Sequence, residues 1–336
     1  MKIKIIAVVC VSLLALVFGV ALGSVSIPLD DLFRMLGHKL FGLGLPEHIK
    51  PTSVTILWNF RLPRVLLAFA AGGAISVSGA VMQSIIRNPL ASSYTLGVSS
   101  GASFGACLVI FYGAALPIAS NFALPVMGFI FGLGTIFLVV GFAQKLDGQM
   151  QNYTIILVGM VFSLFINAIT TLLAALKQDF IQKLIYWQMG TFAMKDWPIV
   201  FILIPIAIIG TLFIMHYNRE LDMMTFGEDQ AMSMGVNLKA VKWILLIASA
   251  ALTGCVIAFC GIIGFVDLVV PHIIRKVFGA SHRYVIPMSA VFGGAFMVIC
   301  DLVARTVAPP SELPVGAVTA IIGAPFFGYI YFCGRK

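Results

Sequence analysis

Apolar residues form ten long runs along this chain, separated by short segments that hold most of its charged side chains. A helix needs roughly 20 residues to cross about 30 Å of hydrocarbon, and most of the runs meet or approach that length. The pattern therefore predicts an all-α, polytopic membrane protein with about ten transmembrane helices. The predicted spans are residues 5–24, 62–85, 96–116, 122–143, 153–176, 198–216, 243–263, 265–279, 285–306 and 314–333.

Two divisions between these spans, near Pro117 and at Gly264, are the least sharply marked, because hydropathy alone could merge the runs there. The first run, "MKIKIIAVVCVSLLALVFGVALGS", has the lysines, apolar core and small residues of a secretory signal peptide. Further spans follow it instead of a secreted domain. We therefore expect an uncleaved first helix and a single transmembrane domain over residues 1–336.

The composition agrees with a lipid-embedded chain. Hydrophobic residues make up 60% of the sequence and charged residues 10%, with a mean hydropathy of +1.06. A soluble domain has roughly 45–50% apolar and 25% charged residues. The net charge of +8 could indicate nucleic-acid binding, but basic loops against an anionic cytoplasmic leaflet account for it, so we expect no nucleic acid.

The six cysteines all lie in apolar segments without CxxC spacing. They are predicted to be small buried hydrophobes, not metal ligands or disulfide partners.

Placing the N-terminus on the inner side of the membrane distributes the basic residues unequally between the two sides. This orientation puts 12 of the 21 Lys and Arg residues on the inner side and 9 on the outer side, the bias of the positive-inside rule. An even number of spans returns the C-terminus to the same side. We therefore expect both termini in the cytoplasm of a multi-pass membrane protein.

The outer segment before the second span is predicted to contain an amphipathic helix over about residues 26–41. Its apolar residues are spaced as one face of a helix, and Ser26 can cap its start. We expect this helix to lie along the outer face of the membrane. The residues of the apolar face are Leu29, Leu32, Phe33, Leu36 and Leu40.

The longest inner segment, residues 217–242, is interpreted as a partner-binding loop. It combines four acidic residues with large apolar side chains that are predicted to be exposed, a combination typical of protein contacts. A solvated linker is the alternative. The apolar residues are Met223, Met224, Phe226, Met232 and Met234.

Several motifs do not occur in the sequence. There is no phosphate-binding loop of the G-x-x-x-x-G-K-[ST] type, no intramembrane series of ionisable residues such as proton-driven carriers use, and no catalytic constellation. An ion-coupled secondary carrier and a membrane enzyme are therefore disfavoured. If the protein moves a substrate uphill, we expect the energy to come from another subunit.

Small residues recur at helical spacing in several spans, for example at Gly72 and Gly101, and predict close helix packing. A weak inverted repeat is also suggested. In "SGAVMQSIIRNPLA" and "CGIIGFVDLVVPHI" a glycine precedes a proline by ten residues, Gly79 to Pro89 and Gly261 to Pro271. Halves of opposite orientation are a common transporter design.

A family resemblance rests on motifs that run in order from about residue 55 to 333. They are "RLPRVLLAFAAGGAISVSGAVMQSIIRNPLASSYTLGVSSGASFGA", "YWQMGTF", "GEDQAMSMGVN", "GFVDLVVPHIIR", "HRYVIPMSA", "DLVAR" and "ELPVGAVTAIIGAPFF". These resemble the iron-chelate and cobalamin (FecCD-type) permeases of ABC importers. The resemblance implies a ten-helix permease that pairs with an identical copy or a paralogue. It also implies two ATPase subunits inside, which hold ATP and Mg, and a substrate-binding protein outside, with no cofactor on this chain.

The resemblance assigns roles to residues at both ends of the spans. Arg61, Arg64 and Arg305 are expected to sit at the outer mouth and pair with glutamates of the binding protein; the alternative is that they anchor span ends among lipid headgroups. An arginine fork suits such carboxylate pairing. At the inner end, the expected cytoplasmic gate residues are Asn88, Leu90, Gln151, Asn152 and Tyr153.

The "GEDQAMSMGVN" loop resembles the coupling helices that sit in an ATPase cleft. The expected ATPase contacts are Gly227, Glu228, Met232, Met234 and Gly235.

One residue departs from the family pattern. Asp267 stands where the family usually has glycine. It is either a tolerated polar residue near the outer boundary or a carboxylate at the outer mouth that pairs with an arginine or attracts a cationic cargo. His272 matches the family's histidine and is interpreted as structural, because a lone imidazole makes a poor metal site. No metal site is predicted.

The cargo is predicted to be an iron chelate such as a siderophore. Cobalamin and haem remain alternatives, because the family's path is lined by bland residues and selectivity lies largely in the binding protein.

Overall fold

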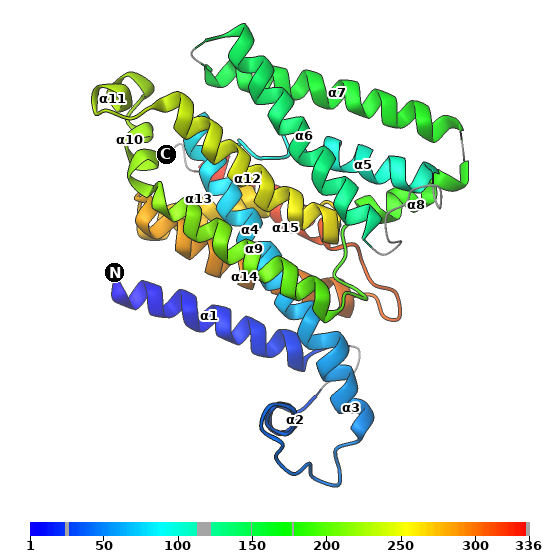
Figure 1. Cartoon of the computed structure of the whole chain (residues 1–336). Helices are drawn as coiled ribbons and strands as arrows, with labels where there is room; N and C mark the ends of the chain where they lie inside the picture. Colours follow the sequence, from blue (N-terminus) through cyan, green and yellow to red (C-terminus); the bar gives the residue numbers. More distant parts are fainter. Residues whose placement is uncertain (24–26, 113–121, 149, 177, 334–336) are drawn as a thin grey trace.

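The architecture was obtained as a computed structural model, which describes residues 1–336 except 24–26, 113–121, 149, 177 and 334–336. The regular secondary structure of the described residues is helical, and Figure 1 shows most of the helices running side by side. Their bounds are α1 Lys2–Ala21, α2 Leu29–Phe41, α3 Pro51–Ile56, the π-helical turn η1 Leu57–Arg61, α4 Leu62–Ile86, α5 Val98–Tyr112, α6 Ala123–Leu146, α7 Asn152–Leu176, α8 Gln178–Gln188, α9 Trp197–His216, α10 Asn218–Thr225, α11 Glu228–Ser233, α12 Leu238–Cys260, α13 Val266–Phe278, α14 His282–Thr306 and α15 Val315–Cys333.

Each predicted span contains a helix. Among the described residues, seven helical stretches are long and apolar enough to cross a membrane, and α5 and α15 are shorter apolar helices. The tenth, α13, has 13 residues and rises about 20 Å at 1.5 Å per residue, which is less than a bilayer core. The all-α, multi-helix prediction is confirmed, and the boundary at Gly264 is a non-helical segment between α12 and α13.

The second span begins earlier than hydropathy predicts. α3, η1 and α4 form one continuous helical stretch from Pro51 to Ile86. Arg61 and Arg64 therefore lie inside a helix and not at its start. The two arginines lower the local hydropathy, so the predicted span began only at residue 62.

α4 is the buried centre of the bundle. Only Leu62, Leu66 and Phe69 of its 25 residues are not buried, and the helix packs against α14, α12, α13 and α9. Small residues make these contacts close, as predicted. A side chain at Gly72 would meet the backbone of Gly293 in α14. The two long apolar helices therefore approach at backbone distance.

A second close contact joins α4 to α13. A β-carbon added at Gly79 would collide with the backbone carbonyl of Asp267, whereas one added at Gly141 on α6 would meet no atom within 4 Å. We therefore expect Gly79→Ala to destabilise the protein by about 1–3 kcal/mol, since overpacking forces the backbone to shift. Gly141→Ala is the matched control. Thermal melting of the purified variants checks this, and equal melting temperatures would contradict it.

The two stretches compared as a weak repeat adopt different local structures. Gly79 lies within α4 and Pro89 follows the end of that helix, whereas Gly261 precedes α13 and Pro271 lies inside it. The two stretches therefore share the spacing of Gly and Pro but not the local backbone structure.

The helix predicted in the outer segment corresponds to α2, although Ser26, its expected cap, lies outside the described residues. Its predicted apolar face is divided. Leu32 is buried, while Leu29, Phe33 and Leu40 are exposed. One part of the face therefore packs on the protein and another part stays uncovered.

Four cysteines are buried and free, as predicted, namely Cys107, Cys255, Cys260 and Cys300, but Cys10 on α1 is exposed. The side chain of Cys333 lies outside the described part of the chain.

Candidate functional site

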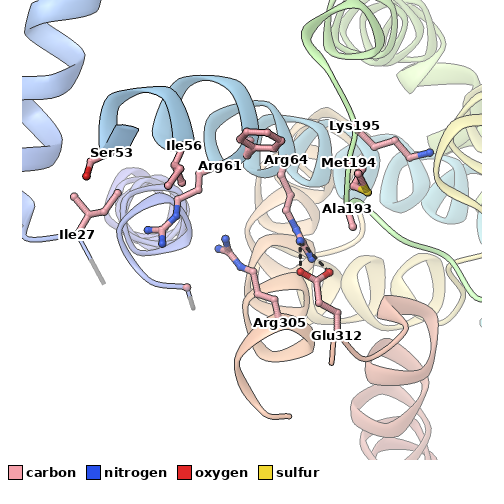
Figure 2. A pocket seen from close by; sticks show the side chains of 12 residues that line it. Ile27, Ser53, Ile56, Arg61, Arg64, Ala193, Met194, Lys195, Arg305 and Glu312 are labelled. Carbon is pink, nitrogen blue, oxygen red and sulfur yellow. Dashed lines mark hydrogen bonds and ion pairs between the residues drawn. The ribbon is translucent and has the colours of Figure 1, made fainter. Parts of the chain in front are cut away.

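The three arginines predicted at the outer mouth meet around one cavity of about 390 Å³. Figure 2 shows Arg61 and Arg305 extending into it, while Arg64 reaches Glu312. The cavity lies at the end of the bundle where α1 ends, α4 begins and α14 ends. Its lining residues are Gly23, Ile27, Ser53, Ile56, Phe60, Arg61, Arg64, Ala193, Met194, Lys195, Arg305 and Glu312.

Arg64 is bound to two carboxylates at once. Its Nε and Nη2 atoms donate to Asp301 on α14 at 3.0 and 2.8 Å, and its Nη1 atom donates to Glu312 at 2.9 Å. The Asp301 side chain is 1% exposed and the Glu312 side chain 42%. A planar guanidinium suits this paired geometry. The buried pair in this cluster, Arg64 and Asp301, joins α4 to α14.

Arg61 and Arg305 bind the end of the first helix. Arg61 donates to the carbonyl oxygens of Val20 and Ala21 at 3.2 and 3.0 Å, and Arg305 donates to that of Gly19. The last carbonyls of a helix lack partners within it and carry partial negative charge, so cations bind there favourably. Both side chains are buried.

All three predicted docking arginines thus have partners within the chain. Lipid headgroups are not needed to explain their position, because the side chains are buried in protein and not placed at a wet boundary. Contact with a binding protein stays a prediction for this end of the molecule. The sequence could not identify the internal partners, which are about 40 to 290 residues away along the chain.

At the opposite end of α4, two predicted gate residues line a cavity of about 460 Å³ against α7. α4 ends at Ile86, and Arg87 adopts a left-handed conformation that turns the chain. The Asn88 side chain then accepts a hydrogen bond from the amide of Leu90 at 2.9 Å. The lining residues are Asn88, Leu90, Ala91, Tyr94, Thr95, Ser100, Ile156, Met160, Ser163 and Leu164.

The other three gate candidates lie beside this cavity without lining it. Asn152 donates to the carbonyl oxygen of Ile86 at 3.2 Å and so joins the start of α7 to the end of α4. Tyr153 is exposed, and Gln151 precedes the helix. The structure therefore brings Asn88 and Leu90 together with α7, and it gives Asn152 a bridging position.

The predicted coupling loop forms a helical hairpin of α10 and α11. Gly227 and Gly235 flank α11 with φ values of 129° and 89°, which L side chains rarely adopt. Phe226, Met232 and Met234 are exposed as predicted. The exposure of Met223 and Met224 was predicted wrongly, because Met224 is buried in the hydrophobic core and Met223 is partly buried against it.

Glu228 has an internal partner. It accepts a hydrogen bond at 2.8 Å from Lys242, whose side chain is fully buried and also donates to the carbonyl oxygen of Met150 at 2.8 Å. A buried ammonium requires such partners. Glu228 is thus held against α12, and its predicted ATPase contact would have to use what remains exposed of its side chain.

Asp267 does not lie at the outer mouth. Its backbone contacts Gly79, which follows Arg64 by 15 residues, or about 22 Å along a helix axis. Its side chain is 2% exposed and accepts a hydrogen bond from Ser92. The prediction failed because residues 261–265 are not helical, so the chain passes inward before α13 begins. Neither of the two interpretations of an outer Asp267 holds.

The described part of the chain contains no candidate metal-binding cluster. No group of three or more His, Cys, Asp or Glu side chains is placed to hold a metal ion there.

Two regions of distinct character therefore lie at opposite ends of α4, an arginine-lined cavity and a hairpin with exposed methionines beside an uncharged cavity. The model of the FecCD transport family matches residues 10–332. This chain belongs to the FecCD transport family. It is a membrane-embedded, multi-pass permease of the ABC importer type.

Individual relatives support the same assignment. The chain is 40% identical over 316 residues to an uncharacterized ABC transporter permease protein, YvrB, of Bacillus subtilis, covering 94% of this chain and 89% of that one. It is 37% identical to the cobalamin import system permease protein BtuC of Halobacterium salinarum, covering 85% and 75%. A solved structure described as an inward-facing conformation of a metal-chelate type ABC transporter matches with a TM-score of 0.84 and 29% identity, covering 98% and 99%.

Some polar contacts beside the predicted sites were missed from the sequence. Asp222 in α10 lies in hydrogen-bond contact with His282 at the start of α14, at 2.6 Å, and Lys242 binds Glu228. The sequence did show that these ionisable residues lie in or beside apolar helices. It did not show which residues they contact, because that depends on the fold.

Proposed function

We propose that this permease translocates an iron chelate, such as a ferric siderophore, delivered by an extracytoplasmic binding protein. ATP is hydrolysed on separate subunits, which hold ATP and Mg²⁺. The separation of the arginine-lined cavity from the methionine-bearing hairpin by the length of α4 supports this proposal most. One end has a cavity lined by basic side chains, whose positive potential would attract a protein partner with carboxylates, and the other offers apolar side chains for a partner inside the cell.

The character of the gate cavity favours a chelate as cargo. All ten of its lining residues are uncharged. A bare ion would leave its hydration shell at a high cost without charged partners, whereas a chelate surrounds the ion with its own ligands. Relatives with at least 31% identity are named for cobalamin, Fe(3+) dicitrate, hemin and molybdate. Cobalamin and haem are therefore the alternative cargoes for this chain.

A second permease subunit, either an identical copy or a paralogue, completes the proposed path. The gate cavity is bounded on one side by α7, most of which is not buried within this chain. Leu157, Val161, Leu164 and Phe165 are exposed on that helix. Lipid could cover this face, but a path between two facing permeases would enclose the cavity and keep the cargo from the hydrocarbon.

The test is uptake by the reconstituted complex. The permease, its ATPase and its binding protein are placed in proteoliposomes and offered a ferric siderophore, haem or cobalamin. We expect vanadate-sensitive uptake that requires ATP and is greatest for the ferric siderophore. Uptake that needs no ATPase and follows an ion gradient would indicate a secondary carrier and contradict the proposal, and preferred uptake of haem or cobalamin would reassign the cargo.

A further inference from the structure

A continuous series of hydrogen bonds begins at Asp222 in the α10–α11 hairpin. Its Oδ1 atom accepts from the backbone amide of His282 at 2.8 Å and lies 2.6 Å from His282 Nδ1, while its Oδ2 atom accepts from Ser281 Oγ at 3.3 Å. The other imidazole nitrogen, Nε2, lies 2.6 Å from Ser84 Oγ on α4. His282 therefore joins the hairpin to the central helix through α14.

The series continues from Ser84 into α13. Arg275 donates to Ser84 Oγ at 3.2 Å, to the carbonyl oxygen of Ala80 at 2.9 Å and to Gln83 Oε1. The amide nitrogen of Gln83 donates in turn to the backbone oxygen of Asp267 at 3.1 Å. The Asp267 carboxylate accepts from Ser92, in the segment that follows α4.

This last segment carries the gate residues. Three consecutive side chains fix it to its surroundings: Ser92 to Asp267, Ser93 to Ser78 Oγ at 2.7 Å, and Tyr94 to the carbonyl oxygen of Ile263 at 2.6 Å. Tyr94 also lines the cavity with Asn88 and Leu90. The path thus runs from the hairpin to the gate through α14, α4 and α13.

Burial makes these hydrogen bonds costly to break. His282 is 1% exposed, and Ser84 and Asp267 are also buried. A polar group that loses its partner away from water keeps its full desolvation cost. A displacement of α10 must therefore either move the inner end of α4 with it or leave buried polar groups without partners.

The carboxylate at the hairpin is charged at neutral pH. Burial disfavours the charged form, but the hydrogen bonds from His282 and Ser281 hold the pKa of Asp222 below its usual value. A pKa lowered on folding stabilises the fold above the unfolded value of about 3.9 and loses this effect as the pH falls through the folded pKa. The ionised contact is therefore complete at the pH of a cytoplasm.

We propose that Asp222, His282, Ser84 and Arg275 are positioning residues that transmit displacement of the α10–α11 hairpin to the gate segment around Leu90. This inference rests on the proposed function, in which the hairpin meets the ATPase. It goes further by naming the route from that contact to the gate. Such coupling depends on a hydrogen-bonded element that has two states. The hairpin and the gate each shift the equilibrium between these states.

A thiol reporter at the gate tests the route without knowledge of the cargo. Leu90→Cys, in a chain with Cys10→Ser and Cys333→Ser, is labelled by a membrane-impermeant maleimide in inverted vesicles that contain the whole complex. The labelling rate is compared without nucleotide and with ATP and vanadate. We expect the two rates of the parent to differ by about fivefold or more, the usual size of an allosteric coupling. His282→Ala and Ser84→Ala should each reduce that difference below about twofold while ATPase activity and subunit association persist.

Ser281→Ala is the matched control. It removes a hydrogen bond to the same Asp222 carboxylate but does not interrupt the path to Ser84, so the difference in labelling should remain. A full nucleotide response in the His282 and Ser84 variants would overturn the inference. So would failure of both variants to assemble, because that result assigns them a purely structural role. A parent complex without ATPase association or nucleotide response would refute the proposed function itself, and the inference with it.

Discussion

Replacing Arg64 with alanine is expected to destabilise the permease by about 3–5 kcal/mol, because the change leaves a buried carboxylate without its cation. Asp301 is 1% exposed, and Arg64 supplies three hydrogen bonds to its two oxygens. Arg305 is a second cation near it, with its Nε atom 3.7 Å from Asp301 Oδ2, beyond hydrogen-bond distance. Thermal melting of the purified protein measures the loss.

Glu312→Gln provides the control for this prediction. Glu312 binds the same guanidinium, but its side chain is 42% exposed. Solvent-exposed ion pairs contribute about 0–1 kcal/mol, so this variant should melt close to the parent. Should Arg64→Ala shift the melting temperature no more than Glu312→Gln does, the buried cluster would not have the structural role described here.

The second large effect is expected at the hairpin. Met232→Glu together with Met234→Glu should weaken retention of the ATPase subunit by about tenfold or more, since two carboxylates would have to be desolvated in the contact. Both methionines are about half exposed, so the fold of the permease should be retained. Co-purification of the ATPase with the tagged permease measures retention.

Met189→Glu is the matched control for the hairpin. It places the same charge on a methionine that is 42% exposed after α8, at the other end of the bundle. We expect full retention of the ATPase in this variant. Equal retention in the double variant and the control would mean that the hairpin does not hold the ATPase.

Hydropathy predicts the helices well because lipid imposes a strong constraint. Every backbone polar group must be satisfied within the hydrocarbon, so long apolar runs must form helices. The glycine spacing likewise predicts close packing, and Gly72 does meet the backbone of Gly293. Both properties depend on the local sequence and on the surrounding lipid. Both can therefore be predicted from the sequence alone.

The partners of the polar residues depend on the fold. Arg61 binds Ala21, and Arg64 binds Asp301, 237 residues away. No local pattern indicates such pairs. A family resemblance can place the arginines at one end of the molecule, but it does not reveal that the same side chains tie α1 and α14 to α4.

The depth of Asp267 was misjudged for a related reason. Hydropathy predicts a full span that starts at the outer boundary, whereas the chain is non-helical over residues 261–265 and α13 has only 13 residues. Gly261 has a φ of 79° at the end of α12, a backbone conformation that favours glycine. The glycines of "CGIIGF" were visible in the sequence, but the direction in which they turn the chain was not.

The most direct test of this account is the side of the membrane on which its two ends lie. Met194→Cys beside the arginine-lined cavity and Met232→Cys on the hairpin are made separately with Cys10→Ser and Cys333→Ser; Met194 is 89% exposed and Met232 52%. An impermeant maleimide should label only Met194→Cys in intact cells and only Met232→Cys in inverted vesicles. Labelling of both positions from one side would contradict the importer architecture.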